Sequence, residues 1–215
     1  MESFFELLRI KRMRQKGQKL LAKGKFEKAF PLFQKIVLQN ESPENIYNLA
    51  LCLMAMSEYE TAESYLEKIQ SDFSGNEMNL LALAECKMMQ KKWQDAKNIF
   101  HHLAEANPRH ESYQNYFSLV SDEVAREKYI SAKKLLMSAT ACLEQKNDKE
   151  ALKLLLEANE LHPDNPNILN NLGSIYMLME DYRNAYNYFS KAYNLDKNNP
   201  KIRNNILTSR RKLRK

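Results

Sequence analysis

The sequence predicts an all-α fold built from pairs of helices stacked one on another. Only four glycines and six prolines interrupt its 215 residues, and no run of alternating apolar and polar residues favours a strand. A small residue also returns at a fixed period, at Ala29, Ala62, Ala96, Ala151 and Ala185, with gaps of 33, 34, 55 and 34 residues. Because 55 is 34 plus 21, one period runs through the chain with a single insertion.

The clearest unit of this pattern is residues 166–199, which read as two short amphipathic helices joined by a polar turn. Apolar side chains recur at helical spacing in both halves: Leu169, Leu172, Tyr176 and Leu178, then Tyr182, Ala185, Phe189, Ala192 and Leu195. Neither helix can bury its apolar stripe alone. We therefore expect each pair to pack against its neighbours.

Four further columns keep the same gaps. They are Gly17, Ala50, Ala84, Ala139 and Gly173; Phe33, Leu66, Phe100, Leu155 and Phe189; Ile36, Ile69, Leu103, Ala158 and Ala192; and the aromatic Phe26, Tyr59, Trp93 and Tyr182, which Asp148 interrupts. A 34-residue unit with these columns and a closing Pro108 or Pro163 resembles the tetratricopeptide repeat. The resemblance implies a right-handed α-solenoid of about five helix pairs, at residues 10–42, 43–76, 77–110, 132–165 and 166–199.

The sequence departs from the family pattern in two ways. The large aromatic residue that is usual early in the first helix is replaced by Met13, Ile46, Leu80, Leu135 and Leu169. Lys87 also lies where an apolar residue is expected. We expect these changes to loosen the third repeat most.

The N-terminal segment predicts a long first helix. Ser3 to Glu6 form a capping box, so the helix is expected to run from Ser3 to Lys23. No repeat precedes its first two turns, which carry Phe4, Phe5, Leu7 and Leu8. These residues either fold back as a cap or contact a partner or a second copy of the chain. The segment fits neither a signal peptide nor a membrane span, so a cytoplasmic location is expected.

The 21-residue excess predicts an inserted helix. Tyr113, Phe117, Val120 and Val124 trace a helical stripe within residues 111–131. This segment is either an orphan first helix or an extension of the next helix. In both cases it divides the chain into an N-terminal stack, residues 1–110, and a C-terminal stack, residues 132–215.

Residues 200–215 predict a basic capping helix. Pro200 opens it, and Ile202, Ile206 and Leu213 lie on one face. Its arginines suit a solubilising cap, and they leave the binding of an acidic surface as a weaker alternative. Nucleic acid is disfavoured because no aromatic residue interleaves with the basic ones.

No pattern in the sequence favours catalysis. His101, His102 and His110 lack metalloprotease spacing, the three cysteines lack paired spacing, and phosphate-binding glycine motifs are missing. The thiols of Cys52, Cys86 and Cys142 are expected to be buried in helix packing. We expect no enzymatic activity, no metal and no cofactor.

The resemblance implies that outward-facing residues of the first helices line a concave groove. The N-terminal repeats contribute Arg14, Gln18, Tyr47, Asn48, Leu51, Met54, Met78, Leu81, Glu85 and Met88. The C-terminal repeats contribute Leu136, Thr140, Asn167, Asn170, Asn171, Ser174, Lys201 and Asn205. The apolar middle predicts binding to a peptide or helical segment of a partner protein, as in an adaptor or chaperone-like scaffold. Alternatively, several of these methionines fill the core.

Asn48, Asn171 and Asn205 lie where repeats of this family often offer a side-chain amide to a bound peptide backbone. The family's carboxylate clamp, which reads chaperone tails, is only half present. Arg14, Gln18 and Asn48 match it, so acidic groups in the partner fit this end, but Met78 and Ala82 replace its last two cations. We therefore do not expect a co-chaperone. The second function class is structural self-association through Phe4, Phe5, Leu7 and Leu8, which would give a homo-oligomer.

Overall fold

The computed structural model describes residues 4–72 and 76–214, and side chains at 6–69 and 76–214. Twelve α-helices and no strand occupy these residues, which confirms the all-α class. The helices are α1 Phe4–Ala22, α2 Phe26–Gln39, α3 Pro43–Ala55, α4 Tyr59–Asp72, α5 Glu77–Met89, α6 Trp93–Ala106, α7 Glu111–Ser121, α8 Glu123–Glu144, α9 Asp148–Leu161, α10 Pro166–Leu178, α11 Tyr182–Leu195 and α12 Pro200–Leu213.

The turn inside each helix pair has one backbone conformation. The residues with positive φ are Gly24, Ser57, Lys91, Lys146 and Glu180, at φ values of 70, 66, 59, 60 and 60°. Their spacing repeats the sequence period, and only Gly24 takes this conformation without steric cost. The next residue donates its N–H back across the turn, as Glu58 does to the carbonyl of Leu53 at 2.9 Å. The polar turn expected within residues 166–199 is thus confirmed at Glu180.

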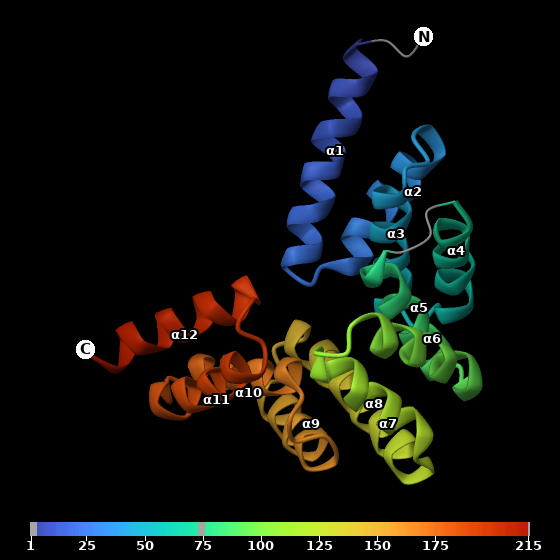
Figure 1. Ribbon diagram of the computed structural model, residues 1–215. Helices are drawn as coiled ribbons and strands as arrows, with labels where there is room; N and C mark the ends of the chain where they lie inside the picture. The colour runs from blue at the N-terminus through green and yellow to red at the C-terminus, as the bar shows by residue number, and fades with distance from the viewer. Residues whose placement is uncertain (1–3, 73–75, 215) are drawn as a thin grey trace. The chain divides into compact units, whose positions relative to one another are not determined.

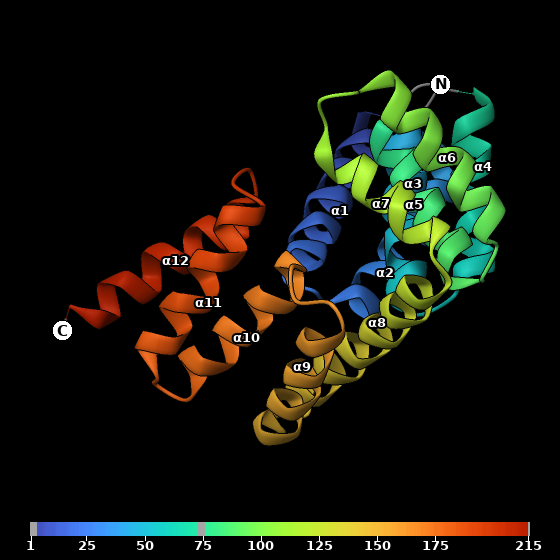
Figure 2. The same cartoon turned by 60° about the horizontal axis from the view of Figure 1, so that its bottom comes forward.

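The helices form two compact units, residues 1–123 and 124–215. In the first unit each helix from α1 to α7 packs against the next, so the pairs stack in chain order (Figure 1). In the second unit α10, α11 and α12 lie side by side in sequence order (Figure 2). This arrangement is that of an α-solenoid.

The repeating columns are the packing seams. Ala29, Ala62, Ala96, Ala151 and Ala185 are all 0% exposed. The glycines allow a still closer approach, because a Cβ at Gly173 would lie 2.6 Å from Cδ1 of Phe189 and one at Gly17 would lie 2.7 Å from Cζ of Phe33. Small residues therefore set how closely the helices of a pair can approach.

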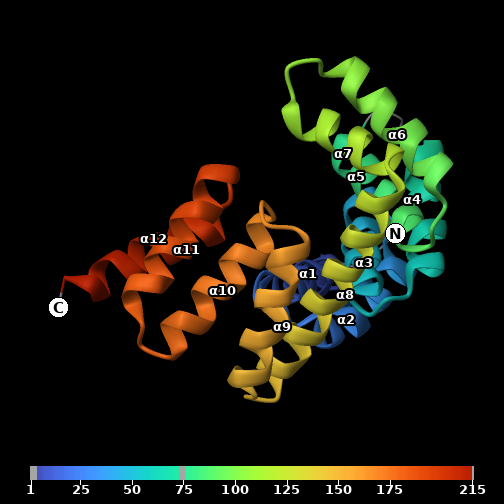
Figure 3. The same ribbon diagram turned by 90° about the horizontal axis from the view of Figure 1, so that it is seen from below.

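The inserted segment forms a separate helix followed by the start of the next one. Helix α7 ends at Ser121, and α8 begins at Glu123. Helix α7 packs on α6 (Figure 3), where the rings of Tyr116 and Phe100 stack with centroids 4.9 Å apart. The Tyr113 hydroxyl also donates to Glu77 at 3.0 Å. Helix α7 therefore adds one further helix to the third pair.

Lys87 does not leave a buried charge unpaired in the third repeat. Its side chain is 12% exposed, and its Nζ lies 2.8 Å from Oε1 of Glu63 and 3.1 Å from Oε1 of Glu67. Lys92 also pairs with Glu63, at 2.9 Å. The expectation that Lys87 loosens this repeat overlooked this network, which joins α4, α5 and the start of α6.

The N-terminal helix extends beyond its partner as expected. The capping residue Ser3 lies outside the described residues, and α1 begins at Phe4. Ile10 is 3% exposed and joins the core of the first unit, whereas Leu7 is 48% exposed. Among the described helices, none is long and apolar enough to span a membrane.

Candidate functional site

The first helices of successive repeats form a shared surface within each unit. Helix α3 contacts both α1 and α5 in the first unit, and α10 contacts α12 in the second. The binding residues expected from the sequence lie on α1, α3 and α5 in the first unit and on α8, α10 and α12 in the second. We call the side of these helices that carries them the first-helix surface. Short loops with asparagine caps position it: Asn76 and Asn165 each accept hydrogen bonds from two backbone N–H groups at the start of α5 and α10.

In the first unit this surface combines apolar and polar side chains. Met78 is 61% exposed, and the half-buried members are Arg14, Tyr47, Asn48, Leu51, Leu81 and Glu85. Gln18 is exposed. The apolar side chains come from both α3 and α5, which are neighbours. A partner segment lying across the two helices can contact them together.

Three expected binding residues are buried, and their assignment to an accessible surface is wrong. Met54 and Met88 are 9% and 1% exposed, and Asn170 is 4% exposed. The two methionines are 34 residues apart and occupy the same repeat position, which faces the neighbouring helices. They fill the core, as the alternative interpretation of these methionines had it.

At the α1 end of the first-helix surface, Arg14 and Gln18 contact the carboxylate of Glu44. Gln18 donates from Nε2 to Oε1 of Glu44 at 2.9 Å, and Arg14 lies 3.6 Å from Oε2 of the same residue. These contacts tie α1 to α3. They also place a negative charge beside the residues that match the carboxylate clamp, so a ligand carboxylate there would have to displace Glu44.

In the second unit the surface is polar and partly used for helix packing. Asn205 donates from Nδ2 to Oδ1 of Asn170 at 2.8 Å and so joins α12 to α10. The hydroxyls of Ser174 and Thr140 donate to backbone carbonyls of Asn170 and Leu136. Among the expected residues of this unit, Asn167 and Lys201 are exposed, whereas Leu136, Asn171 and Ser174 are half-buried.

Sequence reasoning missed two buried asparagines that orient the first helices. Asn45 and Asn79 are both 0% exposed. The Asn45 amide donates to the carbonyl of Asn40 at 2.9 Å, and that of Asn79 donates to the carbonyl of Leu66 at 3.0 Å. Each bond fastens a first helix to the segment or helix before it. Their spacing of 34 residues was the available signal.

Glu85 gives the surface a local negative potential. Burial raises the pKa of Tyr47, and the Glu85 carboxylate raises it further. Burial and the same carboxylate also raise the pKa of Tyr116 and bring that of Tyr59 to about 12. These phenols stay protonated at neutral pH, so each hydroxyl can act as a hydrogen-bond donor.

A metal site requires clustered ligands, and a reactive thiol requires an accessible cysteine. No three His, Cys, Asp or Glu side chains gather in the described ranges closely enough to hold a metal. Cys52 and Cys86 are buried and Cys142 is half-buried, and burial raises the pKa of Cys52 to about 12. A shallow depression on α9 is lined by Lys149, Leu152, Lys153, Leu156, Glu157 and Glu160. All six belong to one helix, so the depression is a gap between its side chains.

Two family models match the chain. The model described as "Anaphase-promoting complex, cyclosome, subunit 3" matches residues 22–103, and the model described as "Tetratricopeptide repeat" matches residues 166–199. The second range is helices α10 and α11, the unit that the sequence columns define best. The chain is a tetratricopeptide-repeat protein. A search of curated protein sequences finds no match.

Solved structures resemble this tetratricopeptide-repeat protein at low identity. The P58(IPK) TPR domain is 15% identical, with a TM-score of 0.46, 96% of this chain covered and 66% of that one. The TPR2AB domain of yeast Sti1 with pHSP90 is 13% identical, with a TM-score of 0.45 and 95% and 84% covered. MamA from Desulfovibrio magneticus RS-1 is 16% identical, with a TM-score of 0.44 and 89% and 97% covered. These similarities carry no statement about the partner.

Proposed function

We propose that this protein is a non-enzymatic adaptor or chaperone-like scaffold that binds a peptide or helical segment of a partner protein on the first-helix surface of residues 1–123. The observation that carries the proposal is the apolar group formed by Tyr47, Leu51, Met78 and Leu81. Met78 is 61% exposed in this group, although methionine is usually buried. An accessible apolar patch on a repeat surface favours an interaction site.

The polar residues around this patch would set the direction of the bound segment. Asn48 is half-buried on α3 and can both donate to and accept from a peptide backbone. Arg14 and Gln18 hold Glu44, so their side of the surface is electrically balanced. A mainly apolar segment therefore fits better than one that ends in a free carboxylate. If the partner protein carries acidic groups, the basic helix α12 is the part of the chain that suits them.

Site-specific photocrosslinking tests this proposal. A photoreactive amino acid at Met78 is compared with one at Leu38, which is 84% exposed and apolar but lies on the second helix α2. Illumination in a lysate of the native host should give a defined protein adduct at Met78 and none at Leu38. Equal adducts at both positions would mean that exposed apolar side chains are captured without regard to the surface.

A variant separates the patch from the fold. Met78→Glu places a charge in the patch at an exposed site, where substitutions usually change stability by only about 0.5 kcal/mol. When the photoreactive amino acid is placed at Asn48 instead, Met78→Glu should abolish the crosslink to the partner protein. It should leave the urea midpoint of unfolding nearly unchanged. An adduct that persists with full yield would contradict binding at the apolar patch.

Self-association through the N-terminal residues is the second candidate. Leu7 is 48% exposed and Leu8 is half-buried, while the side chains of Phe4 and Phe5 lie outside those described. Light scattering of the whole chain and of a Leu7→Asp, Leu8→Asp variant distinguishes the two functions. Self-association predicts a mass that rises with concentration only in the unaltered chain. Peptide binding predicts the same mass for both.

A further inference from the structure

The hairpin formed by α11 and α12 differs in charge from the rest of the protein. Residues 182–214 hold nine basic side chains and one acidic side chain, whereas residues 1–181 hold 23 basic and 26 acidic ones. The net charge of +6 therefore originates in the last two helices. Helix α12 and its C-cap Arg214 together carry six described cations and no acidic residue: Lys201, Arg203, Arg210, Arg211, Lys212 and Arg214.

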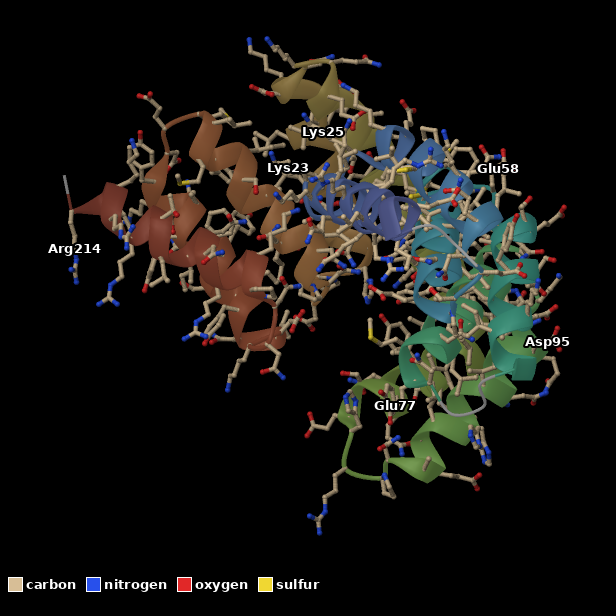
Figure 4. The ribbon with its side chains drawn as sticks, turned by 90° about the horizontal axis from the view of Figure 1, so that it is seen from above. Lys23, Lys25, Glu58, Glu77, Asp95 and Arg214 are labelled. Atoms are coloured by element: carbon tan, nitrogen blue, oxygen red, sulfur yellow. The ribbon has the colours of Figure 1, made fainter. Side chains whose placement is uncertain are left out.

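These six cations are all exposed and available to a ligand. Over the described part of the chain, none of them takes part in a salt bridge with a carboxylate. The Lys212 side chain lies near the Tyr182 ring, with its Nζ 5.6 Å from the ring centre. Arg214 points away from the ribbon at the end of α12 (Figure 4). The positive charge of this helix is thus not neutralised by the protein.

The exposed face of α12 differs from the equivalent face of the preceding repeat. Pro200 lies 34 residues after Pro166, so Leu207 occupies the position of Gly173. That position in α10 leaves no room for a Cβ, because the Phe189 ring packs against it. Leu207 is instead 46% exposed. The close glycine–phenylalanine contact of the preceding repeat is therefore not repeated at Leu207, and this leucine is accessible to a ligand.

The same face combines arginine with leucine at helical spacing. Arg203, Leu207, Arg210 and Arg214 follow one another at intervals of four, three and four residues, so they form one stripe. Leu213, which is 43% exposed, ends the same helix. Ile202 and Ser209, which are 1% and 0% exposed, lie on an adjacent side of the helix and are packed. The stripe is therefore held in a fixed orientation by α11.

We propose that this arginine and leucine stripe of α12 docks on anionic phospholipid membranes. Guanidinium groups bind lipid phosphates with paired hydrogen bonds, and Leu207 can enter the boundary between head groups and acyl chains. A single helix exposed along one side suits a flat anionic surface. Nucleic acid fits less well because the stripe has no aromatic side chain for base stacking. This proposal is independent of peptide binding on the first unit.

Flotation of the full-length protein with lipid vesicles tests the proposal. Vesicles of phosphatidylcholine alone are compared with vesicles that also contain phosphatidylserine. Binding should require phosphatidylserine and weaken as salt is added. Arg203→Gln with Arg210→Gln should weaken binding roughly 30-fold, which corresponds to about 1 kcal/mol for each basic side chain. Leu207→Ser should weaken it as well.

A matched control removes the same charge elsewhere in the second unit. Lys149→Gln with Lys153→Gln alters two exposed lysines on α9, which carries acidic residues beside them. This variant should bind vesicles as the unaltered chain does, and circular dichroism should show equal melting for all variants.

Three results would overturn the proposal. One is the absence of binding to the anionic vesicles. Another is an equal loss in the α9 control, which would assign the effect to net charge. The third is binding that Leu207→Ser leaves unchanged and that a short single-stranded RNA displaces completely, which would make α12 a nucleic-acid surface.

Discussion

At the scale of single residues, stability depends on matched pairs at the helix crossings. Glycine stands opposite phenylalanine in the first and last repeats, as in Gly173 with Phe189, whereas the second and fourth repeats place alanine and leucine at the equivalent positions. A larger crossing residue thus goes with a smaller partner in these repeats. The pair, more than either residue alone, sets the distance between the two helices.

Gly173→Ala should destabilise the second unit, although alanine favours helix more than glycine. The added Cβ would lie 2.6 Å from the Phe189 ring, and such overpacking costs roughly 1 to 3 kcal/mol. Urea unfolding followed by circular dichroism measures the change, with the exposed Asn187→Ala on α11 as the control. Phe189→Leu should lose less stability in the alanine background than in the unaltered chain. Additive effects would show that the two residues do not limit each other.

At the scale of helices, a buried ion pair fixes α4 against α5 and the turn that follows. Burial alone would raise the pKa of Glu63, but hydrogen bonds from Lys87, Lys92 and Gln90 outweigh it and lower the pKa below its ordinary value of 4.5. Since the folded state favours the ionised carboxylate, Glu63 stabilises the protein above pH 4.5. That contribution is lost as the pH falls through the lowered pKa.

Glu63→Gln should destabilise the first unit at pH 7 by roughly 1.5 to 3 kcal/mol, because it removes the buried charged partner of Lys87 and leaves the more exposed Glu67. Glu67→Gln is the control, since the Glu67 side chain is 54% exposed and the loss of such a pair costs only about 0 to 1 kcal/mol. Urea midpoints at several pH values provide the measurement. The deficit of the Glu63 variant should shrink below pH 4.5. A deficit that does not change with pH would mean that shape, not charge, is the cause.

At the scale of the whole molecule, stability should divide between the two compact units. Residues 1–123 and 124–215 each have their own packed helices, and a repeat protein is stabilised mainly by contacts between neighbouring elements. A substitution that destabilises one unit therefore need not destabilise the other.

We expect two unfolding transitions that can be shifted separately. Gly17→Ala should lower the urea midpoint of one transition and Gly173→Ala that of the other, because the two glycines lie in different units. Hydrogen exchange followed by mass spectrometry assigns each transition to its peptides. If either substitution shifts a single transition along the entire chain, the units unfold together and this division is wrong.

The sequence by itself determined the helices, their turns and the seams between them. A helix repeats its faces every 3.6 residues, and the 34-residue period adds the constraint that each pair meets the next in the same way. The five columns, the turn within residues 166–199 and the inserted helix could be predicted because these features depend on the local helical pattern and its repetition.

Only the tertiary structure decided which side chains of a helix remain accessible. Met78 is exposed and Met88 is buried, although both belong to α5 and have the same chemistry. Burial depends on neighbouring helices from distant parts of the sequence, and so does the pairing of Asn170 with Asn205 or of Lys87 with Glu63. Periodicity gives the direction of a side chain around its own helix axis. It does not give the side chain that meets it there, because that contact forms only when the helices pack.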